Sequence, residues 1–232
     1  MSTPGTPTER TRLRRHRERG THDRADLNEV LDAGLICHLG AVVDGTPLVL
    51  PTAYGRIGDT LYLHGSVAGR TLAAAADDTQ VCVTVTHLDG VVLARSVFDH
   101  SMNYRSAMIF GRPRTVTDAD EVKAGLRAIV EHSAPGQWDT ARQPSRKDLA
   151  ATTVIALALD EASVKIRAGG PAEPEEQDAD RLVWTGVLPI RQVWGAPEPD
   201  PAMPRGIAVP GHFADISGRR VDDNTDTAPA SA

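Results

Sequence analysis

The chain has 232 residues, of which 41% are hydrophobic, 24% charged and 4% aromatic, and its formal net charge is −6. This length and composition are enough for one globular domain with a buried core, and the acidic balance argues against nucleic acid as a partner. Neither a membrane-spanning run nor a signal-peptide core is present, and Cys37 and Cys82 lie in apolar runs. We therefore expect a cytoplasmic protein without a disulfide framework or a structural zinc site.

The two ends of the chain differ in composition from its middle. Residues 1–20 form a basic arm rich in arginine, threonine and proline, whose first part we expect to be disordered. Such an arm can touch nucleic acid or an anionic surface, but a solvated tail is the simpler interpretation. Residues 21–217 are expected to form one domain. Residues 218–232 are expected to be a disordered tail, because this end is small and polar and follows a proline-rich stretch.

The middle of the chain is mainly a series of short apolar or alternating runs, which predict β-strands. These runs cover residues 35–43, 47–54, 60–64, 81–86, 91–97, 107–110, 151–159, 162–166 and 182–193. Asp-Gly or Gly-Asp dipeptides at 44–45, 58–59 and 89–90 predict tight turns between consecutive strands. Antiparallel strands joined in this way predict a mainly-β domain, most simply a closed or split β-barrel with flanking helices.

Three stretches carry helical signals. A short helix near the start of the domain is expected to be capped by Asp26 or Asn28. Residues 69–76, which include four consecutive alanines, predict a second short helix. A third helix is expected to begin at Thr117, with Asp120 at the capping-box position.

Two stretches concentrate the donor groups that bind phosphate. The first is a polar cluster at the entry to a strand, made of Asn103, Tyr104, Arg105 and Ser106. The second is a strand-to-helix junction that runs from His64 through Ser66 to Arg70, where free N–H groups of a helix start would face an anion. Each stretch alone is equally compatible with a polar strand edge or a solvated arginine. Our hypothesis is that the two stretches hold one ligand.

Other motifs of catalysis are absent. The sequence has no dinucleotide-binding or P-loop glycine motif, no HExxH and no nucleophile elbow, and its eight histidines show no metal-ligand spacing. Asp99, His100 and Ser101 have the residue types of a catalytic triad, but adjacent residues cannot adopt triad geometry. His64 fits either a satisfied core or rim histidine or a group that titrates beside a ligand. Trp184 fits either a core position or a contact to a flat aromatic ligand.

Several segments together resemble one known family. In chain order they are Pro51-Thr52, residues 61–66, Gly69-Arg70, residues 93–96, residues 100–106, Gly111 and residues 184–189. This series resembles the flavin-binding split-barrel family of pyridoxamine 5'-phosphate oxidase-like proteins. The nearest resemblance is to the branch that contains nitroimidazole-resistance (Nim) proteins and actinobacterial flavin-nucleotide-binding proteins, and it covers about residues 22–215.

The resemblance implies a homodimer that holds FMN at the subunit interface. The flavin ring would lie along two strands, its phosphate would meet both polar stretches, and a tryptophan would come from the second subunit. The residues implied in cofactor binding are Pro51, Thr52, Leu63, His64, Ser66, Arg70, Asn103, Tyr104, Arg105, Ser106 and Trp184. His64 is also the implied active-site residue, and no metal ligands are implied.

One departure from the family bears on the reaction. Oxidases of pyridoxamine phosphate carry a Ser-Arg-Lys run and an arginine-rich end, where this chain has Ala68-Gly69-Arg70 and, over residues 189–195, a single basic residue. Vitamin B6 oxidation is therefore disfavoured. The expected function is an FMN-dependent oxidoreductase that reduces nitroaromatic or other electron-poor small molecules, with His64 orienting the substrate or delivering a proton.

The alternative is a flavin- or haem-binding protein without turnover, acting as a carrier, a sensor or a haem-handling protein. Haem would take His64 or His100 as an axial ligand, whereas FMN requires the phosphate-binding cluster, and the presence of that cluster favours FMN. A deazaflavin cofactor and a DNA-bound regulator that uses the basic arm stay open as further alternatives. The sequence names neither the electron donor nor the physiological substrate.

Overall fold

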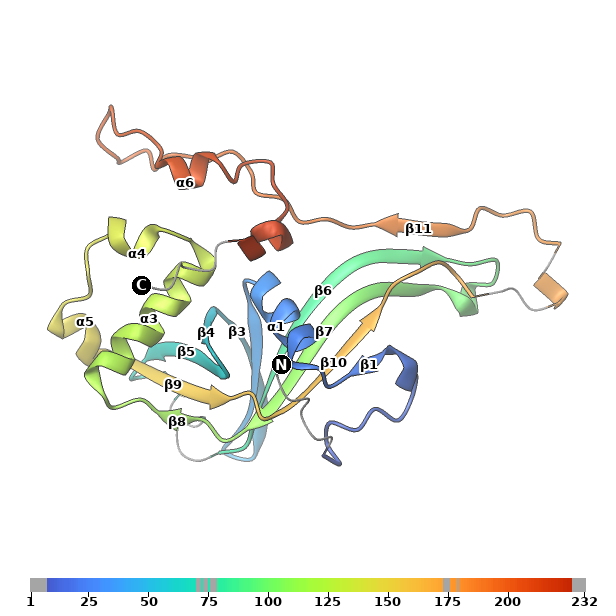
Figure 1. Ribbon diagram of the computed structural model, residues 1–232, viewed down its shortest axis with the longest axis horizontal. Helices are drawn as coiled ribbons and strands as arrows, with labels where there is room; N and C mark the ends of the chain where they lie inside the picture. The colour runs from blue at the N-terminus through green and yellow to red at the C-terminus, as the bar shows by residue number, and fades with distance from the viewer. Residues whose placement is uncertain are drawn as a thin grey trace.

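The computed structural model describes residues 8–69, 72, 75, 79–172, 176–178 and 180–226 (Figure 1). The strands are β1 (Gly20–Thr21), β2 (Cys37–Val43), β3 (Thr46–Thr52), β4 (Tyr54–Ile57), β5 (Thr60–Ser66), β6 (Val81–Leu93), β7 (Ser101–Gly111), β8 (Arg114–Thr115), β9 (Thr152–Ala158), β10 (Glu161–Arg167) and β11 (Gly186–Pro189). The α-helices are α1 (Arg24–Ala33), α3 (Ala119–Ser133), α4 (Gln137–Thr140), α5 (Arg146–Ala150) and α6 (Gly211–Ala214). Four 3₁₀ turns complete the described elements: η1 (Arg17–Arg19), η2 (Val97–Asp99), η3 (Glu176–Asp178) and η4 (Val221–Asp226).

Two antiparallel sheets form the body of the protein. The larger has the strand order β1-β10-β7-β6-β2-β3, with β11 beside β6, and the smaller has the order β4-β5-β9-β8. Side chains from both sheets and from α1 fill the main core, which includes Leu31, Leu39, Tyr54, Leu63, Ile109 and Leu157. The prediction of a mainly-β domain with flanking helices is confirmed.

The helix α3 covers the outer face of the smaller sheet. Tyr62, Val154 and Ile129 form a second buried cluster between the sheet and this helix. At Gly55 of β4, a Cβ atom would lie 2.4 Å from the backbone carbon of Ala128, so only glycine lets the helix approach this closely. Among the described helices, none is both long and apolar enough to cross a membrane.

The two Asp-Gly dipeptides have different structures. Asp44 and Gly45 have φ angles of 51° and 76° and join β2 to β3, as the hairpin signal predicted. The prediction of a turn at Asp89-Gly90 is wrong. The strand β6 continues unbroken through this dipeptide and pairs there with β7 on one side and β11 on the other. A register shift between Leu88 and Gly90 marks a β-bulge there. The resulting β6–β7 hairpin extends well beyond the rest of the body (Figure 1).

The helix caps also differ from the expected ones. The helix α1 is capped by Asp23, which accepts from the Ala25 N–H at 2.7 Å. The helix α3 is capped by Asp118, which accepts from the Glu121 N–H at 2.9 Å. The cap of α1 thus precedes the expected Asp26 or Asn28, and the cap of α3 follows the expected Thr117 by one residue. Both aspartates have the extended backbone that a capping residue needs. The helix expected over residues 69–76 falls largely outside the described residues.

The described part of the N-terminal arm lies against the larger sheet. Arg10 forms an ion pair with Glu161 of β10, and its guanidinium carbon lies 5.6 Å from the centre of the Phe110 ring. Further along the arm, β1 adds a short strand to the edge of β10. These contacts hold residues 8–21 beside the barrel.

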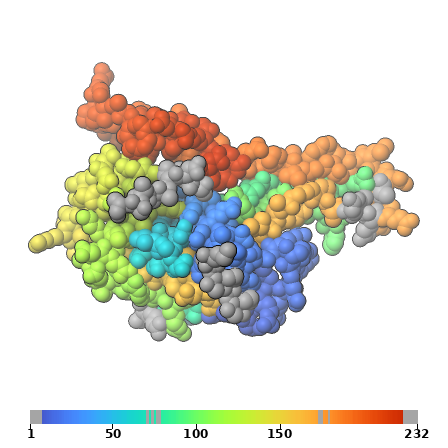
Figure 2. Space-filling model, viewed as in Figure 1, coloured from blue at the N-terminus to red at the C-terminus, as the bar shows by residue number. Residues whose placement is uncertain are grey.

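The C-terminal segment after β11 lies across the body as a closed loop (Figure 1, Figure 2). Its two ends pair through a bridge between Val193 and Arg220 and through the Gly218 N–H, which donates to the Trp194 carbonyl at 2.8 Å. The expected strand 182–193 is much shorter in the structure, since only β11 pairs. The domain end that the sequence suggested, at residue 217, falls inside this paired loop.

Candidate functional site

The expected phosphate cluster is divided between the two faces of β7. Successive side chains of a strand point to opposite faces, so Asn103 and Arg105 share one face while Tyr104 and Ser106 lie on the other. The face that carries Asn103 and Arg105 continues into the core, where Ala107 is fully buried. The four polar side chains therefore do not converge within one chain.

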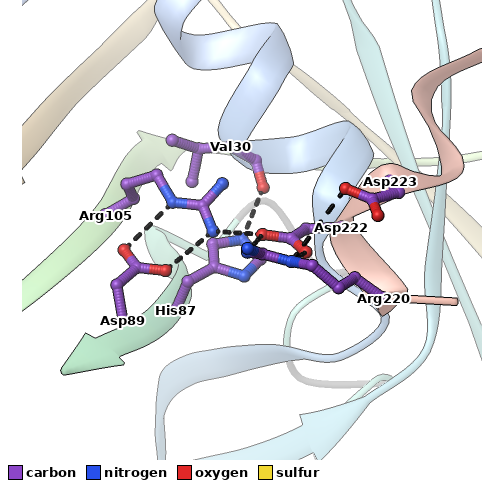
Figure 3. Close-up of polar contacts among 7 residues, drawn as sticks. All are labelled: Val30, His87, Asp89, Arg105, Arg220, Asp222 and Asp223. Carbon is purple, nitrogen blue, oxygen red and sulfur yellow. Dashed lines mark hydrogen bonds and ion pairs between the residues drawn. The ribbon is translucent and has the colours of Figure 1, made fainter. Parts of the chain in front are cut away.

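Arg105 forms the centre of an ion-pair network (Figure 3). Its Nε and Nη2 donate to the two carboxylate oxygens of Asp89 at 3.1 and 2.8 Å, and Nη2 also donates to Asp222 Oδ2 at 2.9 Å. Asp222 in turn accepts two hydrogen bonds from Arg220, at 2.8 and 2.6 Å. Two carboxylates and two guanidinium groups thus alternate from β6 and β7 to the C-terminal loop.

This network stabilises the ionised forms of its side chains. The hydrogen bonds that Arg105 donates to Asp89 are the main reason that the pKa of Arg105 is raised. The hydrogen bonds from Arg220, followed by those from Arg105, lower the pKa of Asp222. The side chains of Arg105 and Asp222 are only 18% and 19% exposed, so water screens this pair little. In the structure Arg105 fastens the C-terminal loop to the barrel.

Asn103 has an anchoring role within the chain. Its amide nitrogen donates to the Gly169 carbonyl at 3.0 Å, and its amide oxygen accepts from Arg167 Nη1 at 2.5 Å. The side chain is buried, and these bonds fix the start of the loop after β10. Sequence reasoning missed Asp89, which was read as a turn residue, and Asp222, which was placed in the tail.

The second expected phosphate stretch lies on the smaller sheet, at the end of β5. Ser66 Oγ accepts from the Ala68 N–H at 3.2 Å, and the Gly69 N–H donates to the Ser66 carbonyl at 2.8 Å. Arg70 lies outside the described residues. The two stretches therefore belong to different sheets of this chain, and their joint use in one site stays a prediction.

His64 is half-buried on β5, and its Nδ1 atom is buried without a hydrogen-bond partner among the described residues. Asn28, Gln137 and His212 each have one such atom as well. Burial lowers the pKa of the His64 imidazole, so the ring is neutral near pH 7. An unsatisfied buried nitrogen of this kind lacks the partner that a buried polar atom normally has. The neighbouring Leu63 side chain is fully buried in the core, so only its backbone can face a ligand.

The remaining expected site residues are accessible at the surface. Pro51 is exposed at the end of β3, directly opposite His38 of β2. The adjacent Thr52 donates its hydroxyl proton to the Ala53 carbonyl at 3.3 Å. Trp184 is 63% exposed and lies two residues before β11, the strand that pairs with β6 of the extended β6–β7 hairpin. Its contact with a cofactor across a dimer interface, which the resemblance implied, stays a prediction.

Several other histidines have protein partners. His87 and His132 pair through Nε2 with the carbonyl oxygens of Val30 and Gly34, at the C-terminal end of α1. His100, the alternative axial ligand, accepts the Ala94 N–H through Nδ1 at 3.1 Å, and its Nε2 has no hydrogen bond to the described residues. Within the described ranges, no group of three or more His, Cys, Asp or Glu side chains is arranged to hold a metal ion.

Comparison with known proteins supports a common family. Residues 23–166 match the family described as pyridoxamine 5'-phosphate oxidase, whereas no curated protein sequence matches the chain. The flavocytochrome Anf3 from Azotobacter vinelandii is 37% identical, with a TM-score of 0.84 over 92% of this chain and 99% of that chain. The FAD and heme binding protein from Mycobacterium smegmatis is 35% identical, with a TM-score of 0.82 over 88% of this chain and 98% of that chain.

A more distant structure shares the fold alone. It is a 5-nitroimidazole antibiotic resistance protein from Bacteroides thetaiotaomicron, 22% identical, with a TM-score of 0.55 over 63% of this chain and 86% of that chain. The family match runs from α1 to β10, and the two more similar structures extend the likeness into the C-terminal segment. The chain belongs to the pyridoxamine 5'-phosphate oxidase-like family of flavin-binding split-barrel proteins.

Proposed function

We propose that this protein is a redox protein of the flavocytochrome type, which binds both a flavin nucleotide and haem. The observation that carries the proposal is the likeness, over nearly the whole chain, to a flavocytochrome and to a FAD and heme binding protein. The resemblance in the sequence pointed to FMN, with haem as the alternative. Binding of both groups by one protein is consistent with these two relatives.

His64 is the residue that fits such a group best. A neutral imidazole with a free nitrogen can ligate haem iron or exchange a hydrogen bond with a flavin ring. Its Nδ1 atom has no partner among the described residues, so a bound group would satisfy it without breaking a hydrogen bond seen there. His100 is the second candidate, because its Nε2 has no bond in the described part of the chain while a backbone N–H fixes its Nδ1 as an acceptor.

The cofactors would supply the electron transfer itself, and the chain would bind and orient them. Because burial holds His64 neutral, the residue can donate or accept one hydrogen bond near pH 7 without carrying charge. A small electron-poor molecule, such as a nitroaromatic compound, is our proposed substrate. The electron-transfer role does not depend on that choice.

A homodimer in the cytoplasm completes the proposal. The outer face of the β2–β3 hairpin and of β7 exposes the apolar side chains of Val42, Val49 and Met108, which are 55%, 64% and 40% accessible. Leu48 and Leu50 point to the opposite face of β3 and are each 40% accessible at this edge strand. An apolar face of this kind is typical of a subunit contact. The exposed Trp184 near β11 would then reach the partner's cofactor site.

The test is the cofactor content of the purified protein and of matched histidine variants. We expect a flavin band pair and a Soret band, and chromatography of the extracted flavin separates FMN from FAD. His64→Ala should abolish the Soret band if His64 ligates iron, whereas His16→Ala, at an exposed histidine paired with Glu18, should leave the spectrum unchanged.

The outcomes separate the alternatives. Loss of the Soret band in His100→Ala instead would move the iron ligand to His100. A flavin spectrum without a Soret band would instead support a flavin-only oxidoreductase. A protein that stays colourless after addition of FMN, FAD and haemin would contradict the proposal.

A further inference from the structure

A cleft of about 420 Å³ lies beneath the C-terminal loop, between this loop and the ends of β7 and β10. A second cleft of about 190 Å³ adjoins it, and the two share the wall formed by Arg105, Asp222 and Arg220. Arg167 and Arg191 also line the larger cleft. Four guanidinium groups therefore surround one space, which is unusual for a protein whose net charge is −6.

These guanidinium groups retain unused donors. Each has five N–H protons in a planar fork. Arg105 and Arg220 use Nε and Nη2 in the ion-pair network, and Nη1 of each makes no hydrogen bond to the described residues. Within the same residues Arg167 bonds to two neutral oxygens, those of Asn103 and Gly170. For Arg191, the described part of the chain provides no hydrogen bond or ion pair.

The carboxylates of the cleft only partly balance these charges. Asp89 and Asp222 are already engaged by Arg105 and Arg220, so their charges are neutralised within the network. Glu29 of α1 also lines the cleft and forms no ion pair. Four positive groups face three negative ones, which leaves an excess positive charge and free donors for an anion.

One side of the same cleft is apolar. Ile166, Pro189 and Ile190 line it opposite the charged groups. The volume lies in the range of pockets that hold small organic ligands, roughly 300 to 1,000 Å³, and is much more than a bare inorganic ion needs. A ligand that uses both sides must therefore carry an anionic group on an apolar or aromatic body.

We propose that this cleft binds an organic phosphate, with the phosphate among the arginines and the organic part against the apolar side. A carboxylate is filled by one bidentate arginine, whereas a phosphate offers enough acceptor oxygens for several guanidinium groups. The site goes beyond the flavin and haem proposal and requires neither group. The phosphate belongs to a small molecule other than the flavin nucleotide, and the experiment tests this by competition with FMN and FAD.

The experiment is isothermal titration of the purified full-length protein with phenyl phosphate, inorganic phosphate and benzoate. We expect phenyl phosphate to bind more tightly than either of the others, because it alone carries both parts. Arg191→Gln should weaken phenyl phosphate about tenfold, since one charge-assisted hydrogen bond is lost and no internal ion pair is broken. Glu29→Gln should strengthen it, because a carboxylate leaves the cleft. Arg205→Gln, at an exposed arginine outside the cleft, is the matched control.

Flavin and haem content, read from the visible spectrum of each variant, keeps this test separate from the proposed function. Simultaneous binding of flavin and phenyl phosphate would assign the cleft to a separate organic phosphate. Displacement of phenyl phosphate by FMN or FAD would overturn the proposal, because the cleft would then be part of the flavin site. The proposal would be overturned if phenyl phosphate failed to bind at about 10 mM, or if Arg191→Gln and Glu29→Gln bound it as the unmodified protein does.

Discussion

The histidine of β5 and the arginine of β7 are both residues that the sequence assigned to ligand binding, and the structure treats them in opposite ways. His64 is half-buried, with a buried nitrogen that no group in the described part of the chain satisfies, and burial keeps its ring neutral. Arg105 carries a full charge and is held by two carboxylates from distant parts of the chain. The comparison teaches that a polar residue at a strand end is a ligand candidate only to the extent that its own fold leaves it unsatisfied.

The largest expected effect is that of replacing Arg105, whose charge is paired within the protein. Arg105→Ala removes two ion pairs and leaves Asp89 and Asp222 partly buried without a partner cation from β7. We expect a loss of about 3 kcal/mol in the free energy of unfolding, measured by urea denaturation. Arg127→Ala, which breaks an ion pair exposed on both sides, should cost less than about 0.5 kcal/mol. Equal, small losses in both variants would show that the network does not fasten the loop.

Replacing His64 should have the opposite effect on the free energy of unfolding. His64→Leu removes a buried nitrogen without a partner, so we expect the apoprotein to be unchanged or stabilised by up to about 1 kcal/mol. His132→Leu is the matched control, because it removes a buried histidine that is bonded to the Gly34 carbonyl. That variant should lose about 1 to 2 kcal/mol in the same urea titration. A loss in His64→Leu as large as in His132→Leu would mean that His64 has a structural partner.

The smallest expected effect is on the pH dependence of the free energy of unfolding. The histidines and Asp222 titrate in different pH ranges, so their contributions can be measured separately. Burial lowers the pKa of His64 and His132 below 6.5, so their contribution is complete above pH 6.5 and is lost as the pH falls below it. The pKa of Asp222 is lowered below 3.8, so its contribution persists to that pH and is lost only in stronger acid.

Thermal unfolding of the apoprotein between pH 8 and pH 3 measures both windows. We expect His64→Leu to reduce the loss of stability that begins near pH 6.5 and to leave the loss below pH 3.8 unchanged. Asp222→Asn should change only the second window. If His64→Leu left the upper window as it was, the imidazole would not be held neutral by burial.

Much of the candidate site was visible in the sequence as residue types. The donors at residues 103–106 and the histidine at the end of a strand were identified from local chemistry alone. Their partners were not, because Asp89 and Asp222 lie 16 and 117 residues from Arg105 along the chain. Ion pairs between such distant residues leave no periodic or spacing signal in a single sequence.

The Asp-Gly dipeptides show what the sequence determined and what the tertiary structure decided. At Asp44-Gly45 the local preference for positive φ angles was enough to predict the hairpin, since the strands on either side pair with each other. At Asp89-Gly90 the same dipeptide became a bulge, because β7 and β11 supply partners on both edges of an unbroken β6. Strand alternation and turn chemistry are local and set the mainly-β class. Which groups end up satisfied, and which stay open to a ligand, depends on long-range pairing that only the folded chain brings about.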